Sequence, residues 1–420
     1  ARRLFDQLVT YLGESQPLHL LPEPEVLPFE RLAVDSHTSN QRLTALAALS
    51  SYSARAGAGP PMVVTSIAAV LRKTLPPVVV APLADPVDGL NSRTLRSGQR
   101  IPRLDDLLVR WVELGYRHEP VVETPGVFSL RGGILDVYPT QADLPYRIEL
   151  WDDEIDTIRR FDPFTQRSVG SADVVTMIPA SEQLPDLVDR ARVEQLIAAM
   201  DFANCHQDFK DRMEEELGAL FSGPDMETLH FYNGVLNQHS LLDHIPASTI
   251  MVMDRMEQVD QEAQDQEEKF YRMRYSREQR GELPRNFPAP YHPWHEISPR
   301  LQSHPGGQVL VQSWLTDDVD PIFRSATPYY GRLEQFTADV RRDLKDGKSI
   351  VVVSQHNRRL AEVLEESEVG VSAAESLEEP PEPGRVYLIH GALSEGWVID
   401  SQNGQSQLTL LTDAELFGTV

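Results

Sequence analysis

The sequence is poor in cysteine, and this limits the chemistry that it can carry. Its 420 residues contain one cysteine, Cys205, so no disulfide framework can form within the chain. Such a composition is compatible with a cytosolic protein. We expect Cys205 to be a small, half-buried residue near a helix, with a reactive thiol as the less favoured alternative.

Long apolar runs are also missing. No run approaches the roughly 18 residues that a helix needs to cross a bilayer. The start, ARRLFDQLVTYLGES, places Leu4, Leu8, Val9 and Leu12 at helical spacing, whereas the apolar part of a secretory signal is continuous. We therefore predict an amphipathic helix of a cytoplasmic protein without a membrane partner. The lack of an initial methionine leads us to expect a fragment of a longer chain.

Positive charge is scarce. Lysine and arginine total 39 against 64 aspartates and glutamates, which gives a formal net charge of −25. Proteins whose main surface neutralises phosphates concentrate positive charge. The composition therefore argues against nucleic acid as the principal partner of this chain, although it leaves a local basic patch open.

Motifs for nucleotide, metal or acyl-transfer chemistry are missing as well. The only Gly-Lys-Ser, at residues 347–349, has Arg342 where a P-loop has its first glycine, and it follows a predicted helix instead of a strand. His292 and His295 lie in a proline loop without cysteine or acidic ligands at metal spacing. Neither GxSxG nor GxGxxG occurs. We predict no catalytic residue, no cofactor site and no metal site.

One predicted strand end resembles part of a motor site. In nucleotide-driven motors an apolar strand ends in Asp-Glu, where the aspartate positions Mg²⁺ and the glutamate orients a water. Here the run Ile250 to Met253 is followed by Asp254 and Arg255. Because arginine replaces the glutamate and no P-loop accompanies it, we expect an ATPase-like core that has lost its chemistry.

What is present predicts a multidomain α/β protein. A chain of this length holds roughly two to four domains. Strands predicted at residues 62–65, 77–83 and 349–354 carry continuous apolar runs and alternate with helices such as 67–75. This pattern is typical of parallel sheets covered by helices. The mixed charges of residues 256–280 predict a long helix with a solvated face.

The centre of the chain follows a different period. Within residues 126–168, apolar and polar residues alternate in the runs 127–130, 134–138 and 146–151. Period-two alternation predicts a meander of short strands. A helix predicted over residues 104–116 presents one broad apolar face. The helix and the meander together predict a compact α+β module.

Arginines gather in this module, and they have two interpretations. The arginines in or beside the strands are Arg131, Arg147, Arg159, Arg160 and Arg167. They could pair with local carboxylates, namely Asp136, Glu149, Asp152, Asp153, Glu154 and Asp156. Alternatively, since arginine and tryptophan dominate protein interfaces, Arg131, Arg147 and Trp151 could converge from neighbouring strands into a docking surface.

Three segments carry a resemblance to a known family. SLRGGILDVYP, continued by LPYRIELWDDEIDTIRRFDPFTQRS, resembles the UvrA-binding domain shared by UvrB and the bacterial transcription-repair coupling factors. FYNGVLNQHSLLDHIPASTIMVMD resembles the stretch that in UvrB leads into the Asp-Glu motif, and LTLLTDAELFG resembles the coupling factors specifically. The resemblance covers nearly the whole chain. It implies the N-terminal half of a coupling factor, comprising the UvrB-homology region and the following domain.

The resemblance implies an architecture. A degenerate helicase-like (RecA-like) α/β domain would comprise residues 1–92 and 179–315, interrupted by the α+β UvrA-binding module at residues 93–178. A small α/β domain of open role would follow at residues 320–420. The P-loop region of the family would precede residue 1.

The resemblance also implies a function. This part of a coupling factor would be an adaptor that recruits UvrA to RNA polymerase stalled at DNA lesions in nucleotide excision repair. Polymerase and DNA would be bound by domains absent from this chain, and ATP-dependent DNA translocation would belong to the parent protein, so this fragment would not be an enzyme.

By position in the motif, the residues that contact UvrA would be Arg131, Arg147 and Trp151. Alanine at both arginines would then abolish UvrA binding while the fold survives. The alternative function is that of a UvrB-like ATP-dependent DNA helicase that binds damage.

Overall fold

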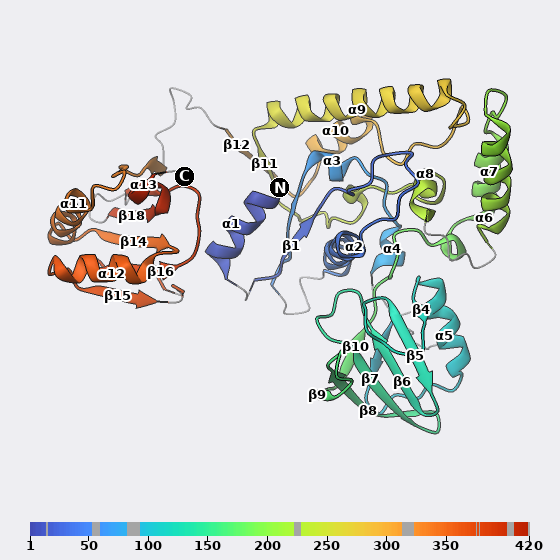
Figure 1. The fold of residues 1–420 in the computed structure, drawn as a ribbon, viewed down its shortest axis with the longest axis horizontal. Helices are drawn as coiled ribbons and strands as arrows, with labels where there is room; N and C mark the ends of the chain where they lie inside the picture. The colour runs from blue at the N-terminus through green and yellow to red at the C-terminus, as the bar shows by residue number, and fades with distance from the viewer. Residues whose placement is uncertain are drawn as a thin grey trace. The chain divides into compact units, whose positions relative to one another are not determined.

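The structure of the chain, a computed structural model, consists of two compact units. It describes residues 1–13, 16–52, 59–81, 93–221, 228–312, 323–374, 376–377, 379–400 and 407–418. The first unit holds Ala1–Arg2 and Pro17–Val311, and the second holds Arg3–Gln16 and Gln312–Val420 (Figure 1). The predicted boundary near residue 92 lies outside the described residues, and the four predicted domain ranges stay predictions.

The body of the first unit contains parallel strand pairs with helices around them. The pairs are β1 (Leu18–Leu21) with β2 (Met62–Thr65), and β11 (Met251–Asp254) with β12 (Gln308–Val311). Helix α2 (Ser36–Ser51) lies between β1 and β2 in the chain and begins at Asp35, whose carboxylate accepts a hydrogen bond from the Thr38 amide at 2.8 Å. Parallel strands connected through helices confirm the predicted α/β class.

The remaining helices of this unit vary widely in length. They are α3 (Ile67–Val70), α4 (Pro77–Val80), α6 (Arg190–Ala198), α7 (Gln207–Ala219), α8 (Asn233–Leu236), α9 (Met256–Gln279) and α10 (Trp294–Gln302), with the 3₁₀ helices η1 (Pro185–Leu187), η2 (Leu229–Tyr232) and η3 (Leu241–Asp243). In α9 the buried residues are Ala263 and Phe270, and Arg274 pairs with Glu278 one turn away at 2.8 Å. The long, solvated charged helix is therefore confirmed.

One predicted strand is wrong. Residues 77–83 read as an apolar strand, but the structure has helix α4 there, and residues 82 and 83 lie outside the described part. Pro77 occupies the first turn of α4, where its fixed φ suits a helix and its missing amide proton is not needed. The Val80 and Ala81 amides donate to Pro76 and Pro77. The helical start set by proline overrides the β propensity of the valines.

Cys205 is buried immediately before α7. Burial raises the pKa of its thiol above the ordinary value, which disfavours the thiolate that a reactive cysteine needs.

In the part of the chain that the structure describes, no helix combines the length and apolarity that a membrane crossing requires.

His244 makes the first unit sensitive to acid. Its imidazole is buried, with Nδ1 2.7 Å from the Ser50 hydroxyl and Nε2 3.0 Å from the Leu75 carbonyl. Burial lowers the pKa of His244 to about 4, so the unfolded chain binds a proton more readily between that value and about 6.5. Stability that is complete above pH 6.5 is therefore lost as the pH falls.

We expect the first unit to lose about 2 kcal/mol of unfolding free energy between pH 7 and pH 5 through His244 alone. Urea unfolding at both pH values measures this loss. In His244→Gln the loss should be smaller by that amount, although the variant starts from a lower stability at pH 7. Parallel stability curves for the two proteins would contradict the assignment.

The central module is a helix packed on a largely antiparallel sheet. Its elements are β3 (Thr94–Arg96), α5 (Leu104–Glu113), β4 (Arg117–His118), β5 (Val127–Arg131), β6 (Ile134–Tyr138), β7 (Tyr146–Trp151), β8 (Glu154–Phe161), β9 (Ser168–Ala172) and β10 (Val174–Thr176). The main sheet has the order β4-β5-β6-β7-β8-β9, and β3 pairs with β10. Trp111 of α5 packs edge-on against Phe128 of β5, with ring centroids 5.6 Å apart. The predicted meander and its covering helix are confirmed.

The second unit is a small α/β domain. Its sheet has the order β13-β17-β18-β14-β16-β15, in which β14 runs parallel to both β16 and β18. The elements are α1 (Arg2–Leu12), β13 (Phe323–Ser325), α11 (Leu333–Lys345), β14 (Ser349–Ser354), α12 (Asn357–Glu366), β15 (Val371–Ala374), β16 (Val386–His390), β17 (Trp397–Asp400), β18 (Gln407–Thr412) and α13 (Asp413–Phe417). Phe336 and Leu360, from α11 and α12, are fully buried in its core.

Two features of this unit bear on sequence predictions. Helix α1 forms as predicted but clusters with this unit, and the Trp397 indole donates to the Tyr11 hydroxyl at 2.9 Å.

The Gly-Lys-Ser segment is a helix-to-strand turn, as predicted. Gly347 has a φ of +77°, which glycine adopts without strain, and the Lys348 ammonium donates to Asp343 at 3.1 Å.

Candidate protein-binding surface of the central module

The sheet of the central module has one face covered by α5 and a second face that is covered in part, because Val127, Tyr138 and Phe161 pack with Val122 in a small buried cluster there. Residues that stand directly opposite each other on neighbouring strands point to the same side. Asp136 of β6 stands opposite Ser129 of β5 and opposite Arg147 of β7. Arg147 in turn stands opposite Arg159 of β8. Leu135 points to the other side, into the core beneath α5.

We call the side away from α5 the outer face. By strand alternation and register it comprises Val127, Ser129, Arg131, Ile134, Asp136, Tyr138, Arg147, Glu149, Trp151, Thr157 and Arg159. Of these, Val127, Ser129, Asp136 and Tyr138 are buried. All three residues predicted to bind UvrA therefore lie on one side of one sheet.

A buried carboxylate holds the two arginines together. Asp136 is fully buried, and Arg147 donates to both of its oxygens, from Nε to Oδ1 and from Nη2 to Oδ2, at 2.8 Å each. Arg131 donates from Nη2 to Oδ2 of the same carboxylate at 2.8 Å. The predicted convergence of Arg131 and Arg147 is thus confirmed, and its centre is Asp136.

The two arginines differ in what else they contact. Arg147 is 18% exposed, its guanidinium lies 4.6 Å from the centre of the Phe161 ring, and Nη1 donates to the Gln166 carbonyl at 3.2 Å. The hydrogen bonds to Asp136 hold the pKa of Arg147 above its ordinary value. Arg131 is 51% exposed. Arg147 therefore anchors the sheet, whereas the Arg131 side chain, paired with the same carboxylate, is half exposed.

Trp151 is the most exposed of the three predicted residues. It ends β7 opposite Glu154, at the rim of the outer face, and it is 81% exposed. Ile134 is also exposed on this face. A large exposed aromatic on the same face as an arginine and an exposed apolar residue has the composition of an interface centre.

Comparisons with known proteins match the central module to a described domain. Residues 94–182 match a family model described as the UvrB interaction domain. Over 427 aligned residues, the chain is 31% identical to the transcription-repair-coupling factor of Myxococcus xanthus, and the alignment covers 95% of the chain. The chain is a relative of the transcription-repair-coupling factors. This confirms the resemblance seen in the sequence.

Other relatives show how far the similarity extends. The transcription-repair-coupling factor of Bacillus subtilis is 26% identical over 99% of this chain. UvrABC system protein B of Acinetobacter baylyi is 28% identical over 59% of it. The chain spans 35%, 34% and 37% of the lengths of the Bacillus, Myxococcus and Acinetobacter proteins, so it corresponds to about a third of each.

The UvrB interaction domain has a further exposed aromatic that the sequence analysis did not select. Phe164, in the turn between β8 and β9, is 89% exposed. The Asp162 carboxylate accepts from the Phe164 and Thr165 amides, at 3.1 and 2.7 Å, and the bond from Thr165 is the main cause of the lowered pKa of Asp162. The DPFT sequence is a turn signal, and an aromatic in it could have been noted.

Asp254, the residue that resembles a motor aspartate, ends β11 outside the UvrB interaction domain. The Arg255 guanidinium donates to its carboxylate at 3.2 Å, and both side chains are exposed. Arg255 also has a left-handed backbone, with a φ of +54°. The arginine that replaces the glutamate of the motor motif therefore pairs with this aspartate.

Proposed function

We propose that this chain is the UvrA-recruiting adaptor region of a transcription-repair-coupling factor and that the outer face of its UvrB interaction domain binds UvrA. The observation that carries the proposal is that Asp136 holds Arg131 and Arg147 on the same face of the sheet as the exposed Trp151. The match of residues 94–182 to the UvrB interaction domain supports it. The parent factor would act in nucleotide excision repair at stalled RNA polymerase.

The three predicted residues have different parts in this proposal. Trp151 would supply the large apolar area at the centre of the interface, and Arg131 would offer a guanidinium fork to a carboxylate or carbonyl of UvrA. Arg147 acts through Asp136, by holding the carboxylate that orients Arg131. It is therefore a positioning residue whose contact with UvrA would be secondary.

The helicase-like body would be a scaffold in this proposal. The pairing of Asp254 with Arg255 supports a degenerate nucleotide site, because the aspartate is paired with a fixed cation and arginine stands at the position directly after it, where a motor has the glutamate that orients a water. Binding of RNA polymerase and DNA, and translocation driven by ATP, would belong to parts of the parent factor outside this sequence.

Arg131→Ala tests the surface. We expect it to weaken UvrA binding about tenfold or more, because truncating an interface arginine typically costs about 1.5 to 2 kcal/mol or more. Its matched control is Arg110→Ala. Arg110 is 49% exposed, like Arg131, but it lies on α5, on the covered side of the sheet. Titration calorimetry of each variant with UvrA gives the affinities.

The control variant should bind within about twofold of the unmodified chain, since surface residues away from an interface contribute little. Equal affinities for Arg131→Ala and the unmodified chain would contradict the assignment of the outer face. Absence of UvrA binding by the unmodified chain would contradict the function itself.

A further inference from the structure

Helix α9 separates its charges by sign along its length. Residues 256–268 carry six acidic side chains and no basic one, whereas residues 269–280 carry five basic side chains and one acidic. The helix dipole favours acidic residues only in the first turn and basic residues only in the last, and ion pairs along a helix need both signs within one turn. Neither effect accounts for a separation over the whole helix. We call residues 269–280 the basic segment.

Three arginines of the basic segment border a groove. Arg272, Arg277 and Arg280, with Met273 and Ser276 between them, line an open space of about 290 Å³. Arg272 and Arg280 are 73% and 59% exposed. The groove therefore presents guanidinium forks to solvent, and its volume is well above the roughly 30 Å³ that one water occupies in the liquid.

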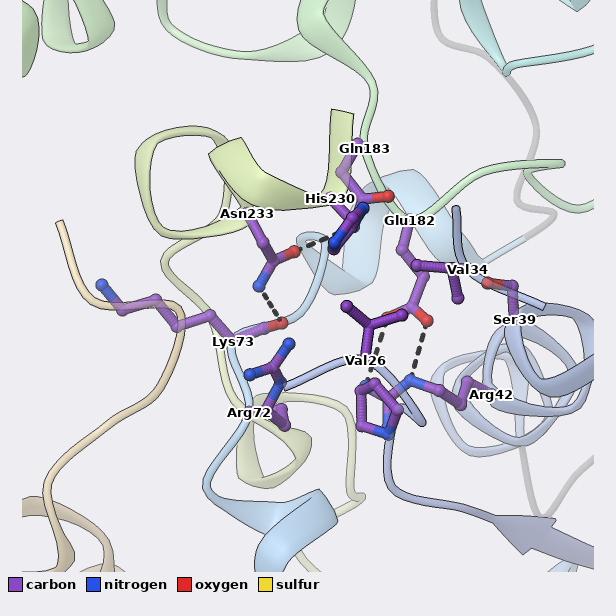
Figure 2. A pocket seen from close by; sticks show the side chains of 11 residues that line it. Val26, Val34, Ser39, Arg42, Arg72, Lys73, Glu182, Gln183, His230 and Asn233 are labelled. Carbon is purple, nitrogen blue, oxygen red and sulfur yellow. Dashed lines mark hydrogen bonds and ion pairs between the residues drawn. The ribbon is translucent and has the colours of Figure 1, made fainter. Parts of the chain in front are cut away.

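An enclosed pocket of the same unit offers no comparable space. Its volume is about 20 Å³, which is room for about one water. Figure 2 shows Arg42 in that pocket, where it makes two hydrogen bonds to Glu182, at 2.7 and 3.1 Å. Because this pair is satisfied within the chain, the groove on α9 is the stronger candidate for a ligand.

The carboxylates near the groove do not balance its arginines. Arg272 pairs with Glu268 one turn earlier. Arg277 and Arg280 share Glu282, at nitrogen–oxygen distances of 3.8 and 3.3 Å. Three guanidinium groups thus face two carboxylates. Exposed pairs of this kind contribute little to stability, so phosphate oxygens can replace the carboxylates at low cost.

Two exposed tyrosines stand beside the groove. Tyr271 and Tyr275 lie one turn apart on α9 and are 65% and 54% exposed. Their rings are nearly parallel, with an interplanar angle of 18° and centroids 6.4 Å apart. Each directly precedes a groove residue, Arg272 or Ser276, and so lies about 100° around the helix from it. Exposed aromatic rings next to arginines are the combination that binds unpaired bases and their phosphates.

We propose that the basic segment binds single-stranded nucleic acid. Arg272, Arg277 and Arg280 hold phosphates along the groove through their guanidinium forks. Tyr271 and Tyr275 stack on bases, which expose their faces only where they are unpaired. A duplex or an acidic peptide would use the arginines and leave both rings without a planar partner. The site goes beyond the proposed function and is independent of it, since α9 lies outside the UvrB interaction domain.

Fluorescence anisotropy of the whole chain with a labelled oligo-dT of about 20 nucleotides tests the proposal. We expect a Kd of about 10–100 μM at ~50 mM salt, weak because the net charge of −25 repels the strand. Three phosphate contacts predict a slope of about −2 for log affinity against log salt. Oligo-U in place of oligo-dT shows whether the ligand is RNA or DNA, and binding of either supports the site.

Two double variants separate the parts of the site. Arg272→Gln with Arg280→Gln should lower the affinity about tenfold or more and bring the slope to about −0.7, because one phosphate contact remains. Tyr271→Ala with Tyr275→Ala should lower the affinity about fivefold or more and leave the slope unchanged, because stacking on bases releases no counterions.

The matched controls are Arg190→Gln and Tyr330→Ala. Arg190 is 68% exposed and pairs with a glutamate one turn away, as Arg272 does, but it lies on α6. Tyr330 is 66% exposed and belongs to the second unit. Both controls should bind like the unmodified chain. Calorimetry should give every variant the Tm of the unmodified chain within about 2 °C, because the substituted side chains are exposed.

Three results would overturn the proposal. The first is no binding of oligo-dT or oligo-U at ~50 mM salt, and the second is equal binding by the unmodified chain and either double variant. The third is displacement of the labelled strand by poly-glutamate, or by a duplex of the same length, as readily as by unlabelled oligo-dT. That result would identify a surface for an acidic protein or for duplex phosphates.

Discussion

Arg147→Ala is expected to destabilise the UvrB interaction domain by about 3 kcal/mol, at the lower end of the usual cost of removing one partner of a buried ion pair, because Arg131 still pairs with Asp136. The substitution removes two hydrogen bonds from the fully buried Asp136 and leaves that carboxylate with Arg131 alone. It also removes the guanidinium that lies over the Phe161 ring. Urea unfolding followed by tryptophan fluorescence measures the loss.

A double-mutant cycle separates the ion pair from simple loss of packing. Because Asp136→Ala removes the charge that Arg147 neutralises, the double variant should be destabilised by less than the sum of the two single variants, by about 1 kcal/mol or more. Arg131→Ala, which truncates a half-exposed side chain, should cost less than about 1 kcal/mol. If the losses of unfolding free energy in the two single variants add up to the loss in the double variant, Arg147 does not act through Asp136.

This expectation revises one prediction made from the sequence. Alanine at both Arg131 and Arg147 was expected to abolish UvrA binding with the fold intact. The structure predicts that this double variant loses stability as well as binding, so a lost interaction would not identify a contact. The single variants Arg131→Ala and Trp151→Ala are the clean tests.

Trp151→Ala is expected to weaken UvrA binding by about 30-fold or more, because exposed tryptophans at interface centres contribute about 2 kcal/mol or more. The side chain is 81% exposed, so its removal should leave Tm unchanged within about 1 °C. Biolayer interferometry with immobilised UvrA gives the affinity, and calorimetry gives Tm.

Phe164→Ala is the matched control for this prediction. Phe164 belongs to the same domain and is even more exposed than Trp151, but it follows the end of β8 that lies away from the Trp151–Glu154 turn. Trp151→Phe should keep most of the affinity, since an aromatic ring remains. Equal losses in Trp151→Ala and Phe164→Ala would mean that the surface extends to the β8–β9 turn.

Local patterns predicted much of this fold. Period-two alternation gave the strands β5, β6 and β7, and the charge pattern gave α9 almost to the residue. The error at Pro77 arose because a proline pair set a helical start in front of valines. The clustering of α1 with the second unit rests on contacts such as that of Tyr11 with Trp397, and no local pattern encodes a pairing across that separation.

That Arg131, Arg147 and Trp151 share one face of a sheet was predictable, whereas the chemistry that holds the two arginines was not. Arg131, Arg147 and Trp151 follow from strand spacing and residue type. That Asp136 lies opposite Arg147 depends on the register of the β6–β7 hairpin, which changes with a single inserted residue. The sequence therefore offered two interpretations of the arginines, as salt-bridge partners or as a docking surface. The structure shows that Arg147 fits the first and that Arg131, paired but half exposed, can serve both.

The sharing of Asp136 lets one arginine change partner at little cost. If a carboxylate of UvrA draws the Arg131 guanidinium outward, Asp136 still keeps both hydrogen bonds from Arg147. The buried carboxylate thus remains neutralised throughout the exchange, and the sheet need not rearrange. Until that moment Asp136 holds Arg131 in one orientation, so part of the conformational entropy of this side chain has been lost before the encounter. The domain can thereby present an ordered yet releasable cation.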